Sequence, residues 1–537
     1  MQDKQGMILL QQNSQLYNND LRAMLMAFYP GIKIVEDAQA CDSFLLQLRV
    51  DYGEHETIMT ICKHAQELLE AKKAGKLPEE QAKVLSADGC DNPQDLQEVE
   101  ELPYYKGRLL LSPCGYRAKL IGDYQEKNQF RNLLKMASYR LLGQFADRKL
   151  PWGDMTGVRP TKVAMQKWKE AGADFDHVET YYKQVYAVSD TKARLATRVA
   201  KEEMQLVDGM DMETSYCLYI GIPFCPSRCL YCSFTSYPIA RYQEVAKQYV
   251  KTLCKELQYV SEQYKDKKLV AIYMGGGTPT SITHEQIDAI LSAVHEYFDL
   301  SHLLEFTIEA GRPDSITREK LEVMKKHGVS RISINPQTMN DETLKVIGRA
   351  HTKAQTLEAF ALAREMGFGN INMDLIAGLP GEQLAQMQDT LSEIKRLNPE
   401  SLTVHSLAIK RAANLNQQMA EYADQIHQDM DAMLDLVDDC ANELSMVPYY
   451  LYRQKNIGGN LENIGYAKTG CACLYNILIM EEMMDIVAVG AGASTKLVFP
   501  KENRVERVEN CKSVEDYIER FDEMLARKQK YFDNEPS

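Results

Sequence analysis

From Tyr216 onward, short apolar runs alternate with longer stretches of helical periodicity. The apolar runs predict strands at 217–222, 269–274, 304–309, 331–335, 370–376 and 401–407. Segments between them, such as 240–263 and 285–298, repeat apolar residues at the spacing of an amphipathic helix. Six such alternations predict a parallel sheet with helices outside it, either open or closed into a barrel. In both cases the chemistry should lie at the carboxyl ends of the strands.

The first 145 residues show a mixed pattern. Apolar runs predict strands at 7–10, 44–50 and 109–114, whereas helical periodicity covers 19–29, 57–74 and 128–145. The polar stretch 76–95 contains Gly and Pro and predicts a loop or linker. We therefore expect four parts: an N-terminal α/β domain at 1–145, a helical linker at 146–213, a parallel-sheet domain at 214–439 and a smaller region at 440–537. In the last part, residues 513–532 are expected to form a charged surface helix.

Composition narrows the class of protein. The 537 residues are 45% hydrophobic and 26% charged, which is typical of a globular protein. A net charge of −14 argues against nucleic-acid binding as the main function, and no apolar run is long enough to span a bilayer. The 13 cysteines come without a signal-peptide pattern, which predicts a reducing, cytoplasmic location. Most of them, Cys471 and Cys473 included, are expected to be small core residues.

Three cysteines follow the first expected strand. Cys225, Cys229 and Cys232 have the spacing C-x3-C-x2-C. Three thiolates can hold three irons of a 4Fe–4S cube and leave the fourth iron open to a substrate or cofactor. A zinc site would need a fourth ligand and usually pairs two short cysteine motifs, and no second pair follows here. Zinc and ordinary buried thiols remain the alternatives.

Residues suited to ligand binding follow the later strands as well. Gly275–Thr278 is a glycine turn after the second strand, where bare backbone can approach a ligand closely. Glu309 ends the third strand and can accept hydrogen bonds from a ribose or an amine. Gln337 and Arg349 follow the fourth, and Asp374 in the fifth would be costly to bury without a partner. Any one of these residues is more often structural than functional. Because they occur at successive strand ends, together they predict a single ligand-binding site.

This order of motifs resembles the radical S-adenosylmethionine (SAM) superfamily, in which the open iron binds SAM and the reduced cluster cleaves it. Over residues 216–498 the chain is similar to the branch that contains the oxygen-independent coproporphyrinogen III oxidases and related haem chaperones. The phrases at 156–162, 232–238 and 405–411 resemble its HemZ group of coproporphyrinogen dehydrogenases. The implied fold is α/β: a partial (β/α)6 radical-SAM barrel, open on one side, with an N-terminal α/β extension and a smaller C-terminal region.

The resemblance also implies roles for single residues. Cys225, Cys229 and Cys232 would ligate the 4Fe–4S cluster. The residues that would hold SAM are Tyr219, Gly275, Gly276, Thr278, Glu309, Gln337, Arg349 and Asp374. Among them, Tyr219 would lie against SAM and the glycine turn would line its methionine end.

The implied reaction is the oxidative decarboxylation of coproporphyrinogen III to protoporphyrinogen IX in haem biosynthesis. It would need an electron donor, which the sequence does not identify. The substrate is a porphyrinogen with four carboxylates, so cations are expected near the barrel mouth. The candidates are Arg312, Lys410, Arg411 and Arg453.

Three positions separate this chain from its relatives. The oxidases carry a fourth cysteine and a histidine where this chain has Phe234 and Gly221. The chaperones carry a haem-binding histidine where this chain has Tyr475. A haem-binding carrier without turnover, and a radical SAM enzyme with another substrate, therefore stand as alternatives to the oxidase.

Overall fold

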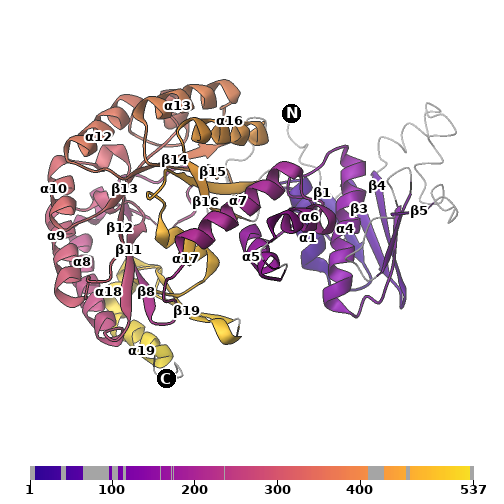
Figure 1. Ribbon diagram of the computed structural model, residues 1–537, viewed down its shortest axis with the longest axis horizontal. Coiled ribbons are helices and arrows are strands. Elements are labelled where there is room, and N and C mark those ends of the chain that lie inside the picture. Colours follow the sequence, from indigo (N-terminus) through magenta and orange to yellow (C-terminus); the bar gives the residue numbers. More distant parts are fainter. Residues whose placement is uncertain are drawn as a thin grey trace. The chain divides into compact units, whose positions relative to one another are not determined.

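The chain forms two compact units in a computed structural model (Figure 1), one made of Met1–Thr197 with Arg453–Leu461 and the other of Arg198–Tyr452 with Glu462–Ser537. The structure describes residues 7–37, 44–63, 96–99, 107–112, 117–157, 159–170, 172, 174–234, 236–408, 429–454, 460–502 and 504–532. No helix among them is long and apolar enough to cross a membrane.

The first unit is built on a mixed sheet with the strand order β2-β1-β3-β4-β7-β6-β5. Its strands are β1 (Met7–Gln12), β2 (Ile34–Val35), β3 (Phe44–Tyr52), β4 (Glu56–Lys63), β5 (Gln97–Glu98), β6 (Arg108–Leu111) and β7 (Arg117–Ile121). Its helices are α1 (Asn18–Phe28), α4 (Lys127–Ala146), α5 (Pro160–Glu170) and α6 (Phe175–Tyr186), and α7 (Asp190–Leu206) contains the boundary between the units.

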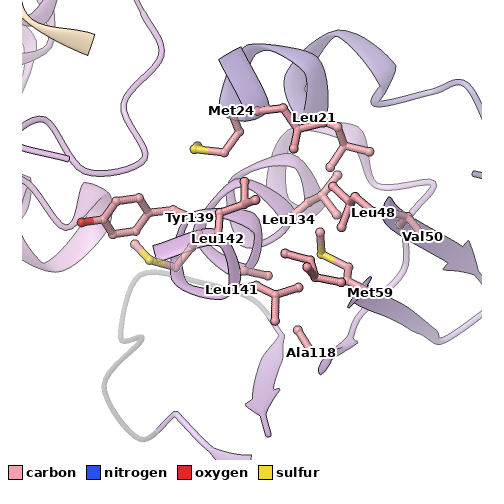
Figure 2. Close-up of a cluster of buried hydrophobic side chains, with 14 of the residues drawn as sticks. Leu21, Met24, Leu48, Val50, Met59, Ala118, Leu134, Tyr139, Leu141 and Leu142 are labelled. Atoms are coloured by element: carbon pink, nitrogen blue, oxygen red, sulfur yellow. The ribbon is translucent and has the colours of Figure 1, made fainter. Parts of the chain in front are cut away.

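The core of this unit lies between the sheet and two helices. Figure 2 shows side chains of α1 and α4, such as Leu21 and Leu134, close to Leu48, Val50 and Met59 of the sheet. These residues are at most 1% exposed, so the apolar faces of the two helices are removed from water against the strands.

The predicted helix at 57–74 is wrong where the structure describes it, because residues 57–63 belong to β4. Thr57, Met59 and Ile61 are buried, whereas Ile58 and Thr60 are partly exposed, which is the two-residue period of a strand. Antiparallel pairing with β3 on one side and β7 on the other decides between the two interpretations. Residues 64–74 and the predicted linker at 76–95 lie outside the described residues.

A segment from late in the sequence completes the first unit. In the sequence, Arg453–Leu461 comes between two segments of the second unit, yet it belongs to the first unit. The guanidinium of Arg453 donates to the carbonyl of Met155 at 2.6 Å and lies 5.4 Å from the centre of the Trp152 ring. The side-chain amide of Asn460 donates to the same carbonyl at 3.1 Å.

The second unit is built on a sheet whose described strands have the order β16-β17-β15-β14-β13-β12-β11-β8-β18-β19-β20. The parallel strands are β8 (Ser215–Ile222), β11 (Lys268–Gly276), β12 (Glu305–Gly311), β13 (Arg331–Gln337), β14 (Ile371–Ala377), β15 (Ser401–Ser406) and β18 (Asp485–Val489). The other strands are β16 (Val447–Arg453), β17 (Glu462–Ala467), β19 (Ser494–Phe499) and β20 (Arg504–Glu509), and β9 (Phe224–Cys225) pairs with β10 (Tyr237–Pro238).

Helices cover the outside of this sheet. Figure 1 shows α8, α9, α10, α12 and α13 as an arc around the strands. The helices are α8 (Ile239–Gln263), α9 (His284–Tyr297), α10 (Arg318–Lys326), α11 (Asp341–Val346), α12 (Lys353–Glu365), α13 (Leu384–Leu397), α16 (Met430–Glu443), α17 (Leu474–Glu481), α18 (Val514–Glu519) and α19 (Phe521–Phe532). Short 3-10 turns are η3 (Pro279–Ser281), η4 (Pro313–Ser315) and η7 (Pro500–Glu502).

The predicted partial barrel is confirmed. Each of the six expected strands is present within two residues of its predicted ends, and β16 and β20 end the described sheet without pairing to each other. The pattern did not predict the seventh parallel strand, β18, which pairs with β8 on the side away from β11.

Helix α17 packs against the sheet through Tyr475, Ile477 and Leu478, in a cluster that includes Val270 and Ala271 of β11. Its first turn is held by Glu305 at the start of β12, whose carboxylate accepts from the backbone amide of Leu474 at 2.6 Å. A carboxylate at this place satisfies a free amide and matches the helix dipole. The thiol of Cys473, buried as predicted, also donates to Glu305 at 3.3 Å.

The predicted single surface helix at 513–532 is wrong, because the segment divides at Arg520 into α18 and α19 and buries part of each. Tyr517 and Lys528 are both 0% exposed and bond to the buried Glu256 of α8 at 2.6 and 2.8 Å. Glu256 also accepts from the backbone amide of Gly490 at 2.8 Å, which ties the C-terminal helices to the turn after β18.

The Lys528–Glu256 pair should be the strongest polar contribution to the docking of α19. We expect Lys528→Ala to lower the free energy of unfolding of the second unit by roughly 3–5 kcal/mol, because Glu256 is left buried without its cation. Lys530→Ala, at an exposed position of the same helix, should change it by less than about 0.5 kcal/mol. Denaturant unfolding with hydrogen exchange on α18 and α19 measures both, and equal losses in the two variants would contradict the assignment.

Candidate functional site

One accessible polar position per strand marks the inner side of the second unit's sheet. Apart from terminal residues, the six neighbouring strands from β8 to β15 are buried except at a single side chain each, and so is β16, which lies beyond the fully buried β17. These side chains, which we call the lining row, are Tyr219, Tyr273, Glu309, Asn335, Asp374, His405 and Tyr452. Parallel sheets are normally buried on both faces, so a shared accessible level indicates that solvent or a ligand reaches the sheet there.

Contacts connect most of the lining row. The Tyr219 and Tyr273 rings are stacked with centroids 6.3 Å apart, and the Tyr273 hydroxyl donates to Glu309 Oε1 at 2.6 Å. At the other end, Asp374 Oδ2 lies 3.9 Å from His405 Nε2, and His405 Nδ1 lies 3.4 Å from the Tyr452 hydroxyl. The row is therefore one polar surface rather than seven isolated residues.

The three predicted cluster cysteines lie on the loop that leaves β8. Two backbone bonds from the glycine turn hold its start: Gly277 N donates to Ile222 O at 2.8 Å and Thr278 N donates to Phe224 O at 2.7 Å. A Cβ atom at Gly277 would lie 2.6 Å from Phe224 O and 3.1 Å from the Cys225 sulfur. Glycine is therefore required for the two loops to approach each other.

The far side of the cysteine loop is held by the segment after β13. Leu230 N donates to Ile347 O at 2.9 Å, and the Ser227 hydroxyl donates to Gly348 O at 3.2 Å. Arg349 donates to the Tyr231 hydroxyl at 3.1 Å and also to the carbonyl of Asn335. Arg349, which the sequence predicts to contact SAM, therefore lies between the cysteine loop and the end of β13.

The cysteine thiols suit a metal cluster in their chemistry. Burial raises the pKa of Cys225 to about 11, partly offset by the Thr278 hydroxyl 3.5 Å away. Burial also raises the pKa of Cys232. Iron would displace these protons, since coordinated thiols are deprotonated. Among the described residues no three His, Cys, Asp or Glu side chains form a group that could hold a single metal ion. A 4Fe–4S cube differs in giving each cysteine its own iron, which three separate thiols can satisfy.

The glycine turn and Glu309 lie together. A Cβ atom at Gly275 would lie 2.9 Å from the Glu309 carboxyl group, and one at Gly276 would lie 3.2 Å from the Tyr219 hydroxyl. Gly276 has φ +109°, which strongly favours glycine. The predicted contacts Tyr219, Gly275, Gly276 and Glu309 are therefore neighbours in space, and Thr278 adjoins Cys225.

Glu309 occupies an unusual electrostatic environment. Burial raises its pKa to about 7, the Tyr273 hydrogen bond lowers it, and the neighbouring Asp374 raises it. The backbone amide of Gly276 and the side chain of His405 also lower this pKa, though by less. A carboxyl group that changes its charge near neutral pH is typical of functional sites.

Polar atoms without partners gather at the end of β13. Gln337 has φ +69°, in the left-handed region that non-glycine residues rarely adopt, and its Oε1 is buried without a hydrogen-bond partner. Asn335 Oδ1 and Arg349 Nε, both buried, also lack partners. Strain and unmet hydrogen bonds together indicate a place where a ligand would complete the structure. SAM, with its ribose hydroxyls and amino acid end, fits this donor and acceptor set.

Asp374 is held within the opposite part of the lining row. The side-chain amide of Asn372 donates to its Oδ1 at 2.6 Å, while Oδ2 faces His405. Sequence reasoning gave no role to His405, Tyr452 or Tyr273, although each is a polar residue in an apolar strand. A polar residue within an apolar strand could have identified them. However, tyrosine and histidine are too common in strands for one such residue to indicate a functional site by itself.

The two described cations among the four expected to bind substrate have other partners. The Arg312 guanidinium pairs with both oxygens of Asp314 at 2.8 and 3.0 Å and also donates to Ser227. Arg453 lies in the first unit, bonded to Met155. Lys410 and Arg411 lie outside the described residues.

Known proteins place this chain clearly. The sequence model of the radical SAM superfamily matches residues 219–394. An oxygen-independent coproporphyrinogen-III oxidase-like protein, HemZ of Bacillus subtilis, is 40% identical over 76% of this chain and 83% of its own length. The haem chaperone HemW of Haemophilus influenzae is 31% identical over 56% of this chain and 75% of its own length. A solved structure of coproporphyrinogen III oxidase, HemN of Escherichia coli, matches with 21% identity and a TM-score of 0.48 over 61% of this chain and 73% of that one.

The match to HemZ is decisive because it covers most of both proteins and extends well beyond the 176 residues of the superfamily match. The 4Fe–4S cluster and SAM are the cofactors of this superfamily. The chain belongs to the radical SAM superfamily and, within it, to the HemZ family of coproporphyrinogen-III oxidase-like proteins.

Proposed function

We propose that the protein catalyses the oxygen-independent oxidative decarboxylation of coproporphyrinogen III to protoporphyrinogen IX. The observation that supports this most is the lining row beside the cysteine loop, a polar surface large enough to involve seven strands. The substrate class comes from the relative named an oxygen-independent coproporphyrinogen-III oxidase-like protein.

In this proposal Cys225, Cys229 and Cys232 hold the 4Fe–4S cluster, and the rest of the loop fixes their places. Bonds from Gly277 and Thr278 hold one side, and bonds to Ile347 and Gly348 hold the other. Anchoring on both sides keeps the loop shape independent of the ligand, which is what a preformed cofactor site requires.

SAM would lie between this loop and the lining row. Gly275 and Gly276 leave room for Glu309 and Tyr219 to lie against the turn, where the methionine end of SAM would bind. Glu309 and Asp374 would accept hydrogen bonds from its amine and ribose, and Gln337 offers an unpaired Oε1. Tyr219, stacked on Tyr273, would form the wall beside it.

When bound, the reduced cluster and SAM would supply a 5′-deoxyadenosyl radical able to remove a hydrogen atom from a propionate side chain. That propionate would then lose carbon dioxide and pass one electron to an external acceptor, which leaves a vinyl group, and the same reaction at a second propionate would complete protoporphyrinogen IX. The protein would contribute position, because the lining row would hold the edge of the substrate toward SAM.

A second candidate is a haem carrier on the same scaffold. It is favoured by the similarity to haem chaperones and by Phe234, which is 63% exposed where the oxidases have a fourth cysteine. Against it, the residue aligned with the chaperone histidine is Tyr475, which is 3% exposed and stacked on Tyr273. A side chain in that position is ill suited to reach a haem iron.

Cysteine replacement tests the cluster assignment. We expect Cys225→Ala, after anaerobic reconstitution, to lose most bound iron and sulfide and to form neither 5′-deoxyadenosine nor protoporphyrinogen. Cys254→Ala is the matched control, because this partly buried cysteine lies on α8, where its thiol donates to Ala289 O at 3.9 Å. Iron analysis and product quantification give the result. Equal iron in the two variants would remove Cys225 from the cluster.

Haem retention separates the enzyme from the carrier. We expect the wild-type chain, mixed with haemin and passed over a size-exclusion column, to retain far less than one haem per chain. The same preparation, reconstituted and reduced, should convert coproporphyrinogen III when SAM is added. Stoichiometric haem without porphyrinogen turnover would favour the carrier. 5′-Deoxyadenosine without a porphyrin product would keep the radical chemistry and reject the substrate.

A further inference from the structure

Three tyrosines from different elements form a continuous stack beside Glu309. The rings of Tyr273 on β11 and Tyr475 on α17 have centroids 4.6 Å apart with planes 19° from parallel. Tyr219 on β8 stacks at 6.3 Å from Tyr273 and 6.2 Å from Tyr475, at 12° and 20°. Aromatic pairs in such offset arrangements are mutually attractive, so each ring restrains the other two.

The stack fixes the direction of a single hydroxyl. With its ring held by two neighbours, Tyr273 has little freedom, and its hydroxyl donates to Glu309 Oε1 at 2.6 Å. Gly275 leaves the space that the carboxyl group occupies, since a Cβ there would lie 2.8 Å from the Tyr273 ring and 2.9 Å from Glu309. The carboxyl group is therefore held between a tyrosine on one side and bare backbone on the other.

We propose that Tyr273 is a positioning residue for SAM binding: its hydroxyl holds Glu309 as an oriented carboxylate against the Gly275–Gly276 turn, where the cationic end of SAM would lie. The inference rests on the proposed assignment of Glu309 to SAM. Tyr273 acts through Glu309, and Tyr219 and Tyr475 act by holding its ring.

A phenol that donates to a carboxylate favours the ionised form of the acid. Burial raises the pKa of Glu309, and the Tyr273 hydroxyl lowers it more than the Gly276 amide or His405 does. Without the Tyr273 bond, the pKa of Glu309 should therefore rise above about 7. The other titratable groups that face Glu309 stay the same: Asp374 on β14, His405 on β15, Tyr219 on β8 and Tyr475 on α17. SAM is a cation, so it should bind better to the ionised form.

The test is the pH dependence of SAM binding, measured by equilibrium dialysis of radiolabelled SAM with reconstituted, unreduced protein, so that no turnover occurs. We expect Tyr273→Phe to move the midpoint of the affinity-against-pH curve upward by about one unit, because a hydrogen bond to an ionised group contributes that much. SAM would then bind about fivefold more weakly than to wild type at pH 7 and nearly as tightly at pH 9.

Tyr475→Phe is the matched control. It removes a hydroxyl from the same stack and keeps the Tyr273–Glu309 bond, so its midpoint should equal that of wild type. Comparison at each pH cancels the titration of SAM itself. Circular dichroism and iron content confirm that each variant is folded and loaded.

A merely structural role for Tyr273 would give a different result. If Tyr273→Phe weakens SAM binding equally at every pH, or leaves it unchanged, the positioning role is wrong. Glu309→Gln and Asp374→Asn test the underlying assignment separately. If both variants bind SAM as tightly as wild type does, the proposed SAM site is wrong. If both bind SAM weakly but Tyr273→Phe leaves the midpoint of the affinity-against-pH curve unchanged, only the role of Tyr273 is wrong.

Discussion

Burial of both faces of a parallel sheet is the constraint on which the site depends. Helices cover the outside, and α17 with its cluster covers part of the other face, so almost every strand side chain is removed from water. The strands are staggered along the sheet, so that Tyr273 pairs with Thr307 and Glu309 with Ser333, yet the few accessible side chains still come together. Residues far apart in sequence, such as Tyr219 and His405, thereby share one surface without any local motif that joins them.

The strand ends could be predicted because continuous apolar runs of five to seven residues, separated by helices, allow few other structures. The same reasoning failed at 57–63, where a two-residue period was overlooked within a longer apolar segment. It also missed β18. In both places the pairing of strands distant in sequence decided the structure, and local periodicity does not report such pairing.

Within the site, residues at strand ends could be proposed from chemistry alone, whereas their partners could not. Tyr273 is an ordinary strand residue until its bond to Glu309 and its stacking on Tyr475 are seen. Arg312 shows the opposite case. It was an attractive carboxylate binder in the sequence, but Asp314 and Ser227 already occupy its guanidinium, so it shapes the cysteine loop instead. If the proposed substrate with its four carboxylates is correct, its recognition must draw on groups other than Arg312.

The Arg453–Leu461 segment has a consequence for the order of events during translation. Domains at the start of a chain generally fold as they leave the ribosome, before later parts are made. Here the carbonyl of Met155 is bonded by Arg453 and Asn460, about 300 residues downstream. The N-terminal unit therefore cannot reach its final contacts until most of the barrel has been synthesised, and the nascent chain must carry an incomplete first unit through that interval.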